Sequence, residues 1–284
     1  MRVLIISDGK AGHLNQSIAF AKLKGLEFDI LEIENRVKFS TYILDFLGVY
    51  TNLFSLHVES SKKYDAVVSA GSSTYYANRY IAKRLKIKSI AIMLPRGFRY
   101  GGFDYILASM HDNPPKLKNI ISLPIGLSFS EPKGLIKSSS APSIGIILGG
   151  SNSVFEMRRE DIKKSLDAIF KEYPNHLKYI TTSRRTPKEI DELIKNYEFD
   201  YKVIYSQNDS LNPIPDFLEV CEELFISIDS TSMLSEAKAN SNAQIHIVEL
   251  KSKKSATKFH KLAQTIKQMS GKFDFKPYLQ RVSL

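Results

Sequence analysis

Several classes of protein are excluded by what the sequence lacks. Cys221 is the only cysteine among 284 residues, so the chain forms neither an internal disulfide nor a cysteine-based zinc site. No run of about 18 apolar residues is available to span a membrane. The apolar N-terminal stretch turns polar at Ser7, which is too early for a signal-peptide core. We therefore expect a cytoplasmic protein in a reducing compartment, with contact at the inner face of the membrane left open.

Motifs for metal and cofactor chemistry are missing as well. The sequence contains no Asp-x-Asp pair and no cluster of histidine, aspartate and glutamate at metal-ligand spacing. It also contains no Gly-x-Ser-x-Gly turn, no Walker loop and no complete Gly-x-Gly-x-x-Gly turn. These absences predict a protein without a metal ion or a resident cofactor. They also argue against a hydrolase, a P-loop protein and a dinucleotide-binding enzyme.

The balance of charge is basic. Lysine and arginine number 40 against 30 aspartates and glutamates, which leaves a net charge of +10. Basic chains bind polyanions, anionic lipid head groups or phosphorylated ligands. The lysines are dispersed, no basic stripe alternates with stacking aromatics, and nucleic-acid-binding motifs are absent. We therefore expect a phosphorylated small molecule or an anionic membrane surface as the partner, and no nucleic acid.

Short apolar runs alternate with helical patterns along most of the chain. Expected strands are 2–7, 28–33, 64–70, 89–94, 104–109 and 119–124 in the first half, and 143–150, 177–183, 201–206, 224–229 and 244–250 in the second. Expected helices are 13–24, 41–56, 73–85, 159–173, 187–197, 213–221, 230–240 and 255–269. Continuously apolar strands that alternate with helices predict parallel sheets covered on both faces. The predicted class is α/β, with doubly wound, Rossmann-like sheets.

The length and one irregular segment predict two domains. Domains of about 140 residues fit the usual size range. Residues 126–143 are rich in serine, proline, glycine and lysine and lack periodicity, as a linker does. We assign residues 1–130 and 131–284 to two Rossmann-like domains that face each other across a cleft, which is the glycosyltransferase-B architecture. A periplasmic-binding-protein layout is the alternative, and the lack of a signal peptide weighs against it.

The first expected strand is followed by SDGKAGHLNQ, residues 7–16, which is richer in glycine and polar residues than a plain turn requires. Ligands of open α/β sheets bind at the carboxyl ends of the strands. His13 is the candidate general base, because an imidazole titrates near neutrality, and Asp8 could orient it or act as the base itself. Gly12 and Asn15 would then lie on the acceptor side. Alternatively, His13 only caps the helix or faces solvent.

Other loops of the first half could contribute to the same acceptor side. The candidates are Ser72 in AGSST, Arg96 in LPRGFRYGG, and His111 and Asp112 in MHDNPP. Arg96 could instead be simply solvated, and a turn formed by the following proline pair would also explain His111 and Asp112.

Three loops of the second half follow expected strands and suit a phosphate. These are GGSNS with Gly150 and Ser151, TTSRRTP with Ser183, Arg184 and Arg185, and DSTSMLSEA with Ser230, Thr231, Ser232 and Glu236. Glycine and serine allow the backbone to approach an anion, paired arginines bind phosphate, and a helix N-terminus favours negative charge. Glu236 could accept hydrogen bonds from ribose hydroxyls. Structural turns and helix caps are the alternative explanation.

The segment STYILDFLGVYTNLF, residues 40–54, is strongly apolar and aromatic for a helix between strands. Packing in the core would explain this composition. Alternatively, the segment is an interfacial helix that meets a lipid-linked acceptor, with nearby lysine and arginine favouring anionic lipid.

Together, SDGKAGHLNQ, PRGFRYGGFDYILASMHD, ILGGSN, TTSRRTP and DSTSMLSEA resemble the mitochondrial-fission-protein-like family, whose bacterial members are often labelled nucleoside-diphosphate-sugar epimerases. The resemblance covers nearly the whole chain and implies a glycosyltransferase-B-like fold. GGSNS and DSTSMLSEA are also similar to segments of the N-acetylglucosaminyltransferase of peptidoglycan synthesis. That likeness implies that Ser151 contacts a diphosphate, that residues 230–232 cap it, and that Glu236 holds the ribose.

The resulting hypothesis is a metal-independent glycosyltransferase that uses a nucleotide-sugar donor as substrate and a cell-envelope or lipid-linked glycan as acceptor. A nucleotide-sugar epimerase on the same fold is one alternative. A binding or scaffold protein that keeps the fold without chemistry is the other.

Overall fold

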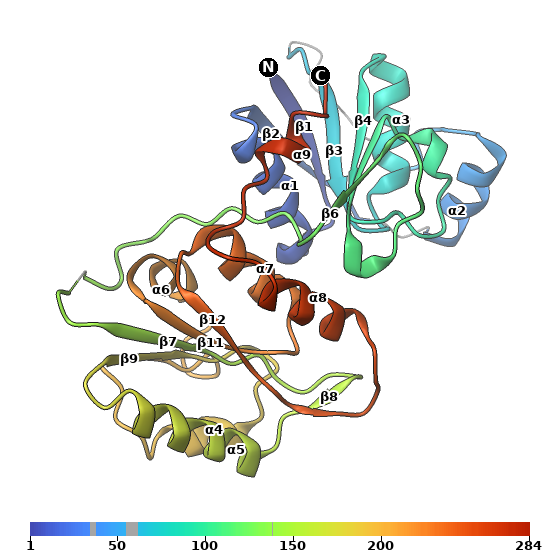
Figure 1. Cartoon of the computed structure of the whole chain (residues 1–284). Coiled ribbons are helices and arrows are strands. Elements are labelled where there is room, and N and C mark those ends of the chain that lie inside the picture. The colour runs from blue at the N-terminus through green and yellow to red at the C-terminus, as the bar shows by residue number, and fades with distance from the viewer. Residues whose placement is uncertain (35–37, 55–61, 138) are drawn as a thin grey trace. The chain divides into compact units, whose positions relative to one another are not determined.

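The chain divides into two compact units (Figure 1). The computed structural model describes residues 1–34, 38–54, 62–137 and 139–284. Unit 1 comprises Met1–Phe129 and Asp274–Leu284, and unit 2 comprises Ser130–Phe273. Residues 274–284, which were expected in the second domain, instead belong to unit 1. Lys24 explains this, because its Nζ donates to the carbonyl oxygens of Leu279 at 3.0 Å and Val282 at 2.9 Å.

Unit 1 contains a six-stranded parallel sheet in the order β2-β1-β3-β4-β5-β6. Its strands are β1 (Arg2–Ser7), β2 (Glu27–Glu32), β3 (Ala66–Ala70), β4 (Lys88–Ile92), β5 (Tyr105–Ser109) and β6 (Ile120–Leu123). Its α-helices are α1 (Ala11–Leu23), α2 (Lys38–Leu47), α3 (Tyr75–Leu85) and α9 (Lys276–Leu279), and it has short 3₁₀ turns at Tyr100–Gly102 and Met110–Asp112.

The core of unit 1 follows from its apolar central strands. All residues of β3 are buried, and β1 pairs with it in parallel from Val3 opposite Ala66 to Ile6 opposite Ser69. Chain connections leave the centre of the sheet in opposite directions, so right-handed crossovers place α1 and α3 on opposite faces. The order of strands reverses between β1 and β3, and this reversal is where open α/β sheets bind ligands.

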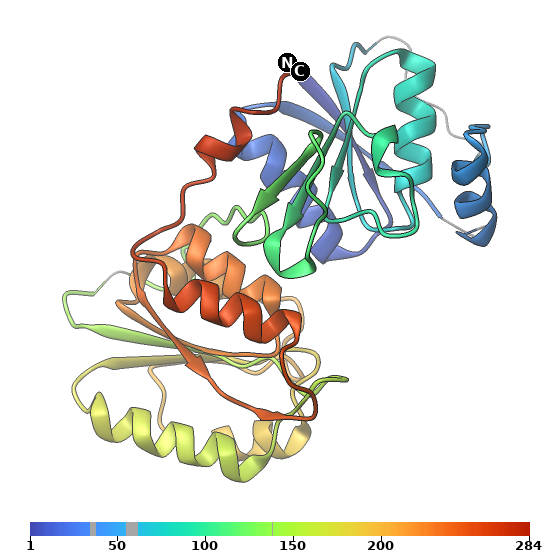
Figure 2. The same ribbon diagram turned by 45° about the vertical axis from the view of Figure 1, so that its right-hand side comes forward.

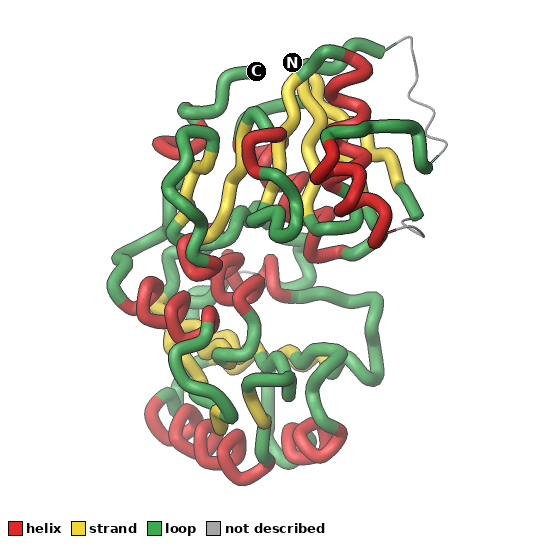
Figure 3. Tube along the Cα trace, turned by 90° about the vertical axis from the view of Figure 1, so that its right-hand side faces the viewer, coloured by secondary structure: helices red, strands yellow, loops and turns green. Residues whose placement is uncertain are grey.

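Unit 2 has a five-stranded parallel sheet in the order β10-β9-β7-β11-β12 and a small antiparallel pair, β8 with β13. The strands are β7 (Ser143–Ile147), β8 (Phe155–Glu156), β9 (Leu177–Thr181), β10 (Tyr201–Val203), β11 (Glu223–Ser227), β12 (Gln244–Val248) and β13 (Lys251–Ser252). The helices are α4 (Arg159–Glu172), α5 (Lys188–Ile194), α6 (Ile214–Val220), α7 (Thr231–Asn240) and α8 (Lys258–Lys267). Helices α4 and α5 cover one face of the sheet and α6, α7 and α8 the other, so that the strands lie between two helical layers (Figures 1 and 3).

Two separate parallel sheets with helices on both faces confirm the predicted α/β class. The expected helix 41–56 is shorter than predicted, since α2 ends at Leu47, and residues 55 and 56 lie outside the described residues. Gly48 ends this helix with φ of +76°, a left-handed conformation that glycine adopts without strain. Within the described residues, no helix is long and apolar enough to cross a membrane.

Candidate functional site

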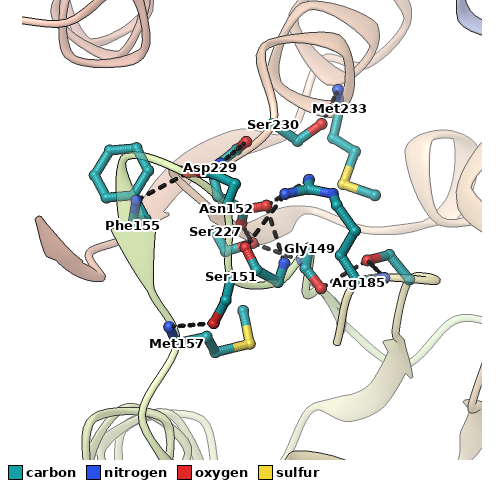
Figure 4. A network of polar contacts seen from close by, with 12 residues as sticks. Gly149, Ser151, Asn152, Phe155, Met157, Arg185, Ser227, Asp229, Ser230 and Met233 are labelled. Atoms are coloured by element: carbon teal, nitrogen blue, oxygen red, sulfur yellow. Dashed lines mark hydrogen bonds and ion pairs between the residues drawn. The ribbon is translucent and has the colours of Figure 1, made fainter. Parts of the chain in front are cut away.

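Three neighbouring strands of unit 2 deliver the three phosphate-type loops to one edge of the sheet. The loops after β9, β7 and β11 carry Ser183–Thr186, Gly149–Asn152 and Ile228–Ser230, and these strands lie side by side. The order of strands reverses between β7 and β11, so this edge is the ligand-binding position of a doubly wound sheet. The structure therefore brings together the loops that the sequence analysis grouped (Figure 4).

Asp229 is the residue that joins these loops. Its side chain is fully buried. Oδ2 accepts from the Gly150 backbone N–H at 2.9 Å and from Arg185 Nη2 at 2.6 Å, and Oδ1 accepts from Ser227 Oγ at 2.6 Å. A buried carboxylate is tolerated because each of these donors compensates for lost hydration. Ser227 also accepts from the Gly149 N–H at 2.7 Å, which extends the network (Figure 4).

This network changes the interpretation of two predicted phosphate ligands. The Gly150 N–H and the Arg185 guanidinium donate to a carboxylate of the protein, so these groups organise the loops. The missing side chain of Gly150 also serves packing, because a Cβ there would lie 2.0 Å from the Arg185 carbonyl oxygen. At Gly149 a Cβ would lie 2.2 Å from Asp229 Oδ2. Gly149 and Gly150 are therefore required because other loops of the same unit leave no room for a side chain.

Serine hydroxyls of the three loops hold backbone groups. Ser151 Oγ accepts from the Met157 N–H at 3.0 Å, and Ser183 Oγ donates to the Gly149 carbonyl at 2.7 Å. Ser230 is the N-cap of α7, where its Oγ accepts from the Met233 N–H at 3.3 Å. Ser230 therefore caps α7, as the alternative explanation expected. The O–H of Ser230 can still donate a hydrogen bond to a ligand.

Three predicted residues beside this network keep their polar groups available. Arg184 and Ser232 are exposed, Thr231 is half-buried, and in the described part of the chain none of these side chains makes a hydrogen bond or ion pair. Thr231 and Ser232 begin α7, whose first N–H groups and dipole favour an anion. These residues are candidates for holding a phosphate, together with the N–H groups of Arg185 that do not face Asp229.

Glu236 lies farther along α7, where it contacts the start of the linker. Its Oε1 accepts from Ser130 Oγ at 3.0 Å, and Asn240 Oδ1 accepts from the Ser130 backbone N–H at 3.0 Å. Burial raises the pKa of the Glu236 carboxyl, and the Ser130 hydrogen bond offsets only part of this. Glu236 therefore accepts a hydrogen bond from a hydroxyl of the protein. The prediction was that it accepts such a bond from a ribose hydroxyl.

The edge of unit 1 contains a carboxylate and imidazole pair. Asp8 follows β1, His13 lies in the first turns of α1, and His13 Nδ1 is 3.0 Å from Asp8 Oδ1. Burial raises the pKa of the Asp8 carboxyl, but the hydrogen bond and charge of His13 and contacts with Lys10 outweigh it, so the pKa lies below its usual value. An ionised Asp8 accepts a hydrogen bond from the His13 Nδ1–H, and this tautomer leaves Nε2 unprotonated and able to accept a proton.

Gly71 gives the His13 ring its place. A Cβ on Gly71 would lie 2.3 Å from His13 Nδ1, and the φ of Gly71 is +90°. The loop after β3 therefore passes directly beneath the imidazole, and β3 is the strand next to β1. The imidazole lies where the order of strands reverses, as the candidate base of a switch-point site should.

The remaining first-domain candidates form a second group at the same edge. Arg96 Nη2 donates to the Asp112 carbonyl at 2.8 Å, and His111 Nε2 is 3.8 Å from Asp112 Oδ2. Burial raises the pKa of the Tyr75 phenol, and the charges of Asp112 and Asp8 add to the rise. Ser72 is half-buried beside Gly71.

Gly12 and Asn15 are exposed on α1. Asn15 is two residues after His13, and residues at that spacing do not share a helix face. The structure therefore does not bring Asn15 to the imidazole.

A family model described as mitochondrial fission ELM1 matches residues 11–278. The chain belongs to this family. No curated protein matches the sequence of this ELM1 family member.

Solved structures similar to this ELM1 family member have low sequence identity. The glycotransferase of kitacinnamycin has 11% identity and a TM-score of 0.50, over 99% of this chain and 87% of that chain. UDP-GlcNAc 2-epimerase from Neisseria meningitidis has 10% identity and a TM-score of 0.49, over 99% and 94%. The glycosyltransferase SnogD from Streptomyces nogalater has 12% identity and a TM-score of 0.48, over 95% and 96%. The first likeness supports the glycosyltransferase-B fold and, at this identity, nothing beyond the fold.

Asp229, Ser227 and Gly71 were not among the site residues predicted for this ELM1 family member. Asp229 ends the apolar run LFISID and Gly71 follows YDAVVSA, so both stand where strands end. Their place at the end of an apolar strand was the feature of the sequence that could have identified Asp229 and Gly71 as site residues. Among the residues that the structure describes, no three His, Cys, Asp or Glu side chains are grouped to hold a metal ion, and metal independence stays a prediction.

Proposed function

We propose that the protein transfers a sugar from a nucleotide-diphosphate donor to a hydroxyl of a cell-envelope acceptor. One observation carries the proposal: three loops of unit 2, held together by Asp229, surround the N-terminus of α7 at the reversal of the sheet. Sites at such reversals take nucleotides in open α/β folds. The glycosyltransferase-B fold is compatible with this class of ligand.

Unit 2 would bind the donor. Arg184 and the first N–H groups of α7 are placed to neutralise the diphosphate, which gains negative charge as it leaves the sugar. Thr231 and Ser232 hydroxyls add uncharged donors to the same group. Glu236 would accept a ribose hydroxyl in place of the Ser130 hydroxyl, because the same carboxylate oxygen can accept from either.

Unit 1 would supply the base. Asp8 holds His13 through Nδ1, and in the described part of the chain no hydrogen bond involves His13 Nε2. His13 Nε2 would take the proton of the acceptor hydroxyl as its oxygen bonds to the sugar carbon. The bond from that carbon to the diphosphate oxygen breaks, and its electron pair leaves with the nucleotide diphosphate. Protons and charge are balanced without a metal ion.

A ligand screen followed by a turnover assay tests the proposal. Thermal unfolding is first measured with uridine, guanosine, adenosine and cytidine diphosphates, since a bound ligand raises Tm by mass action. The matching nucleotide sugars are then incubated with and without lipid extract from bacterial envelopes, and released nucleotide diphosphate and sugar products are measured. We expect one nucleotide to raise Tm and the sugar to be transferred only when extract is present.

The same assay separates the alternatives. An epimerised sugar formed without extract would show a nucleotide-sugar epimerase, and binding without any product would show a scaffold. An Arg184→Gln variant should weaken the nucleotide-dependent shift, whereas Arg281→Gln, which removes an exposed arginine of unit 1, should not. If the nucleotide raises the Tm of both variants equally, Arg184 is not part of the nucleotide site.

A further inference from the structure

Helix α2 presents its apolar side chains outward. Phe39 is 77% exposed, Ile43 47%, Phe46 76% and Leu47 63%, whereas Asp45 is fully buried. The exposed residues are spaced by four, three and one positions, which places them in a single stripe on a helix. We call these four side chains the α2 apolar face. Among the described residues no other helix exposes so many large apolar side chains.

Buried polar contacts hold α2 in this orientation. Asp45 pairs with Arg79 of α3 and accepts from Tyr50 Oη at 2.7 Å and from the Arg99 backbone N–H at 2.9 Å. Turning the helix to bury its apolar face would expose this carboxylate and leave the buried Arg79 guanidinium without its partner, which is costly. Both ribbon views show α2 at the margin of unit 1, beside α3 (Figures 1 and 2). The outward face is therefore a property of the native packing.

The segment Phe39–Phe54, which carries this face, exposes no acidic side chain of its own. From Phe39 to Phe54 the only acidic residue is Asp45, which is buried. The half-exposed Arg99 side chain lies against Gly48, with Nη2 3.2 Å from the position of a Cβ there, and Lys83 Nζ lies 4.2 Å from the centre of the Tyr50 ring. An apolar stripe on a segment that exposes no acid, with Arg99 and Lys83 near that segment and a chain of net charge +10, matches an anionic lipid surface.

We propose that the α2 apolar face docks the protein onto a bilayer that contains anionic lipid. Phe39, Ile43, Phe46 and Leu47 would enter the region between head groups and acyl chains, while Arg99 and Lys83 remain at the head groups. A second copy of the chain fits this face less well, because pairing two such faces would bring together two sets of cations on molecules that each carry +10. The inference concerns where the protein acts and does not depend on the proposed reaction.

Vesicle flotation with the full chain tests the inference. The protein is mixed with vesicles of phosphatidylcholine alone or of phosphatidylcholine with phosphatidylglycerol, and the floated fraction is measured at low and high salt. We expect binding to the anionic vesicles, reduced by salt. The double variant Phe39→Ser, Phe46→Ser should lower this partitioning by roughly tenfold or more. Both positions are exposed, so the variant should keep the Tm of the parent chain.

A matched control removes two exposed leucines of unit 1 outside α2. Leu85→Ser with Leu117→Ser should leave flotation unchanged. Equal loss in both variants, no loss in the α2 variant, or no binding by the parent chain would overturn the inference. A dimer of the parent chain that the α2 variant converts to monomer, seen by light scattering, would overturn it in favour of self-association. The nucleotide-dependent Tm shift is measured without vesicles, so its failure bears on the proposed function alone.

Discussion

Arg185 Nη2 donates to Asp229 Oδ2, and the two atoms are 2.6 Å apart. Because Asp229 also accepts from the Gly150 N–H, one buried carboxylate connects the loops that follow β7, β9 and β11. The arginine that the sequence assigned to a ligand phosphate thus compensates a charge of the protein itself. The edge of unit 2 is organised by internal pairing, which fixes the positions of the groups left for a ligand.

Removing this carboxylate should destabilise unit 2. Asp229→Ala leaves the Gly150 N–H and a half-buried Arg185 without their acceptor, and we expect a loss of about 2–4 kcal/mol in the free energy of unfolding. Urea denaturation followed by circular dichroism measures this loss. Asp209→Ala removes an exposed aspartate and should change stability by less than about 0.5 kcal/mol. Similar effects of the two substitutions would show that the network does not stabilise the fold.

Glu236 should make stability depend on pH. Its folded pKa is raised by burial, so between the unfolded and the folded pKa the native state binds more protons than the unfolded state. The free energy of unfolding therefore decreases as pH rises through that window. Glu236→Gln should remove this dependence and be more stable than the parent chain above the window. Urea denaturation from acidic to neutral pH measures both effects, and an unchanged pH profile in Glu236→Gln would contradict the assignment.

Glu236 should also contribute to nucleotide binding, although it lowers the stability of the fold at neutral pH. If Glu236 holds the ribose, Glu236→Ala should weaken nucleotide binding by about 1–3 kcal/mol, because it removes hydrogen bonds to a charged group. Calorimetric titration with the nucleotide found in the screen measures this change. Ser130→Ala is the control, since it removes the hydroxyl that competes for the carboxylate and should not weaken binding.

Substitution of Gly71, Gly150 and Gly12 by alanine should change stability by different amounts, because the surroundings of the three glycines differ. Gly71→Ala places a Cβ within 2.3 Å of His13 at a φ of +90°, so it should displace the ring and cost about 1–3 kcal/mol. Gly150→Ala should cost at least as much, since the colliding atom belongs to the backbone. Gly12 lies in α1, and nothing lies within 4 Å of the place that an added methyl group would take, so Gly12→Ala should stabilise by about 0.5–1 kcal/mol. Thermal unfolding of the three variants checks this order.

His13→Ala should lower turnover by roughly 10²–10⁴-fold if the imidazole is the base. Donor binding should barely change, since the donor groups belong to unit 2. Added imidazole should restore part of the activity of His13→Ala, which a purely structural histidine would not allow. Full activity of His13→Ala would instead direct the search for the base to Asp8 or Asp112.

The sequence alone determined the fold and the neighbourhood of the sites. Apolar strands such as RVLIIS and SIGIILGG can be stable only with both faces covered, which requires parallel sheets with helices on each side. In such sheets the loops after successive strands reach the same edge. The convergence of the Gly150, Arg185 and Ser230 loops therefore followed from local pattern, as did the proximity of Asp8 and His13.

Tertiary structure alone decided which partner each polar group takes and which face each helix buries. Asp229 follows an ordinary apolar strand, and its importance depends on Arg185, which is 44 positions away in the sequence. The apolar composition of α2 fits a buried helix equally well, until Asp45 is found paired with Arg79 from another helix. Residues 274–284 return to unit 1 because Lys24 donates to their carbonyls. Such choices depend on contacts between residues distant in sequence, and no local periodicity records them.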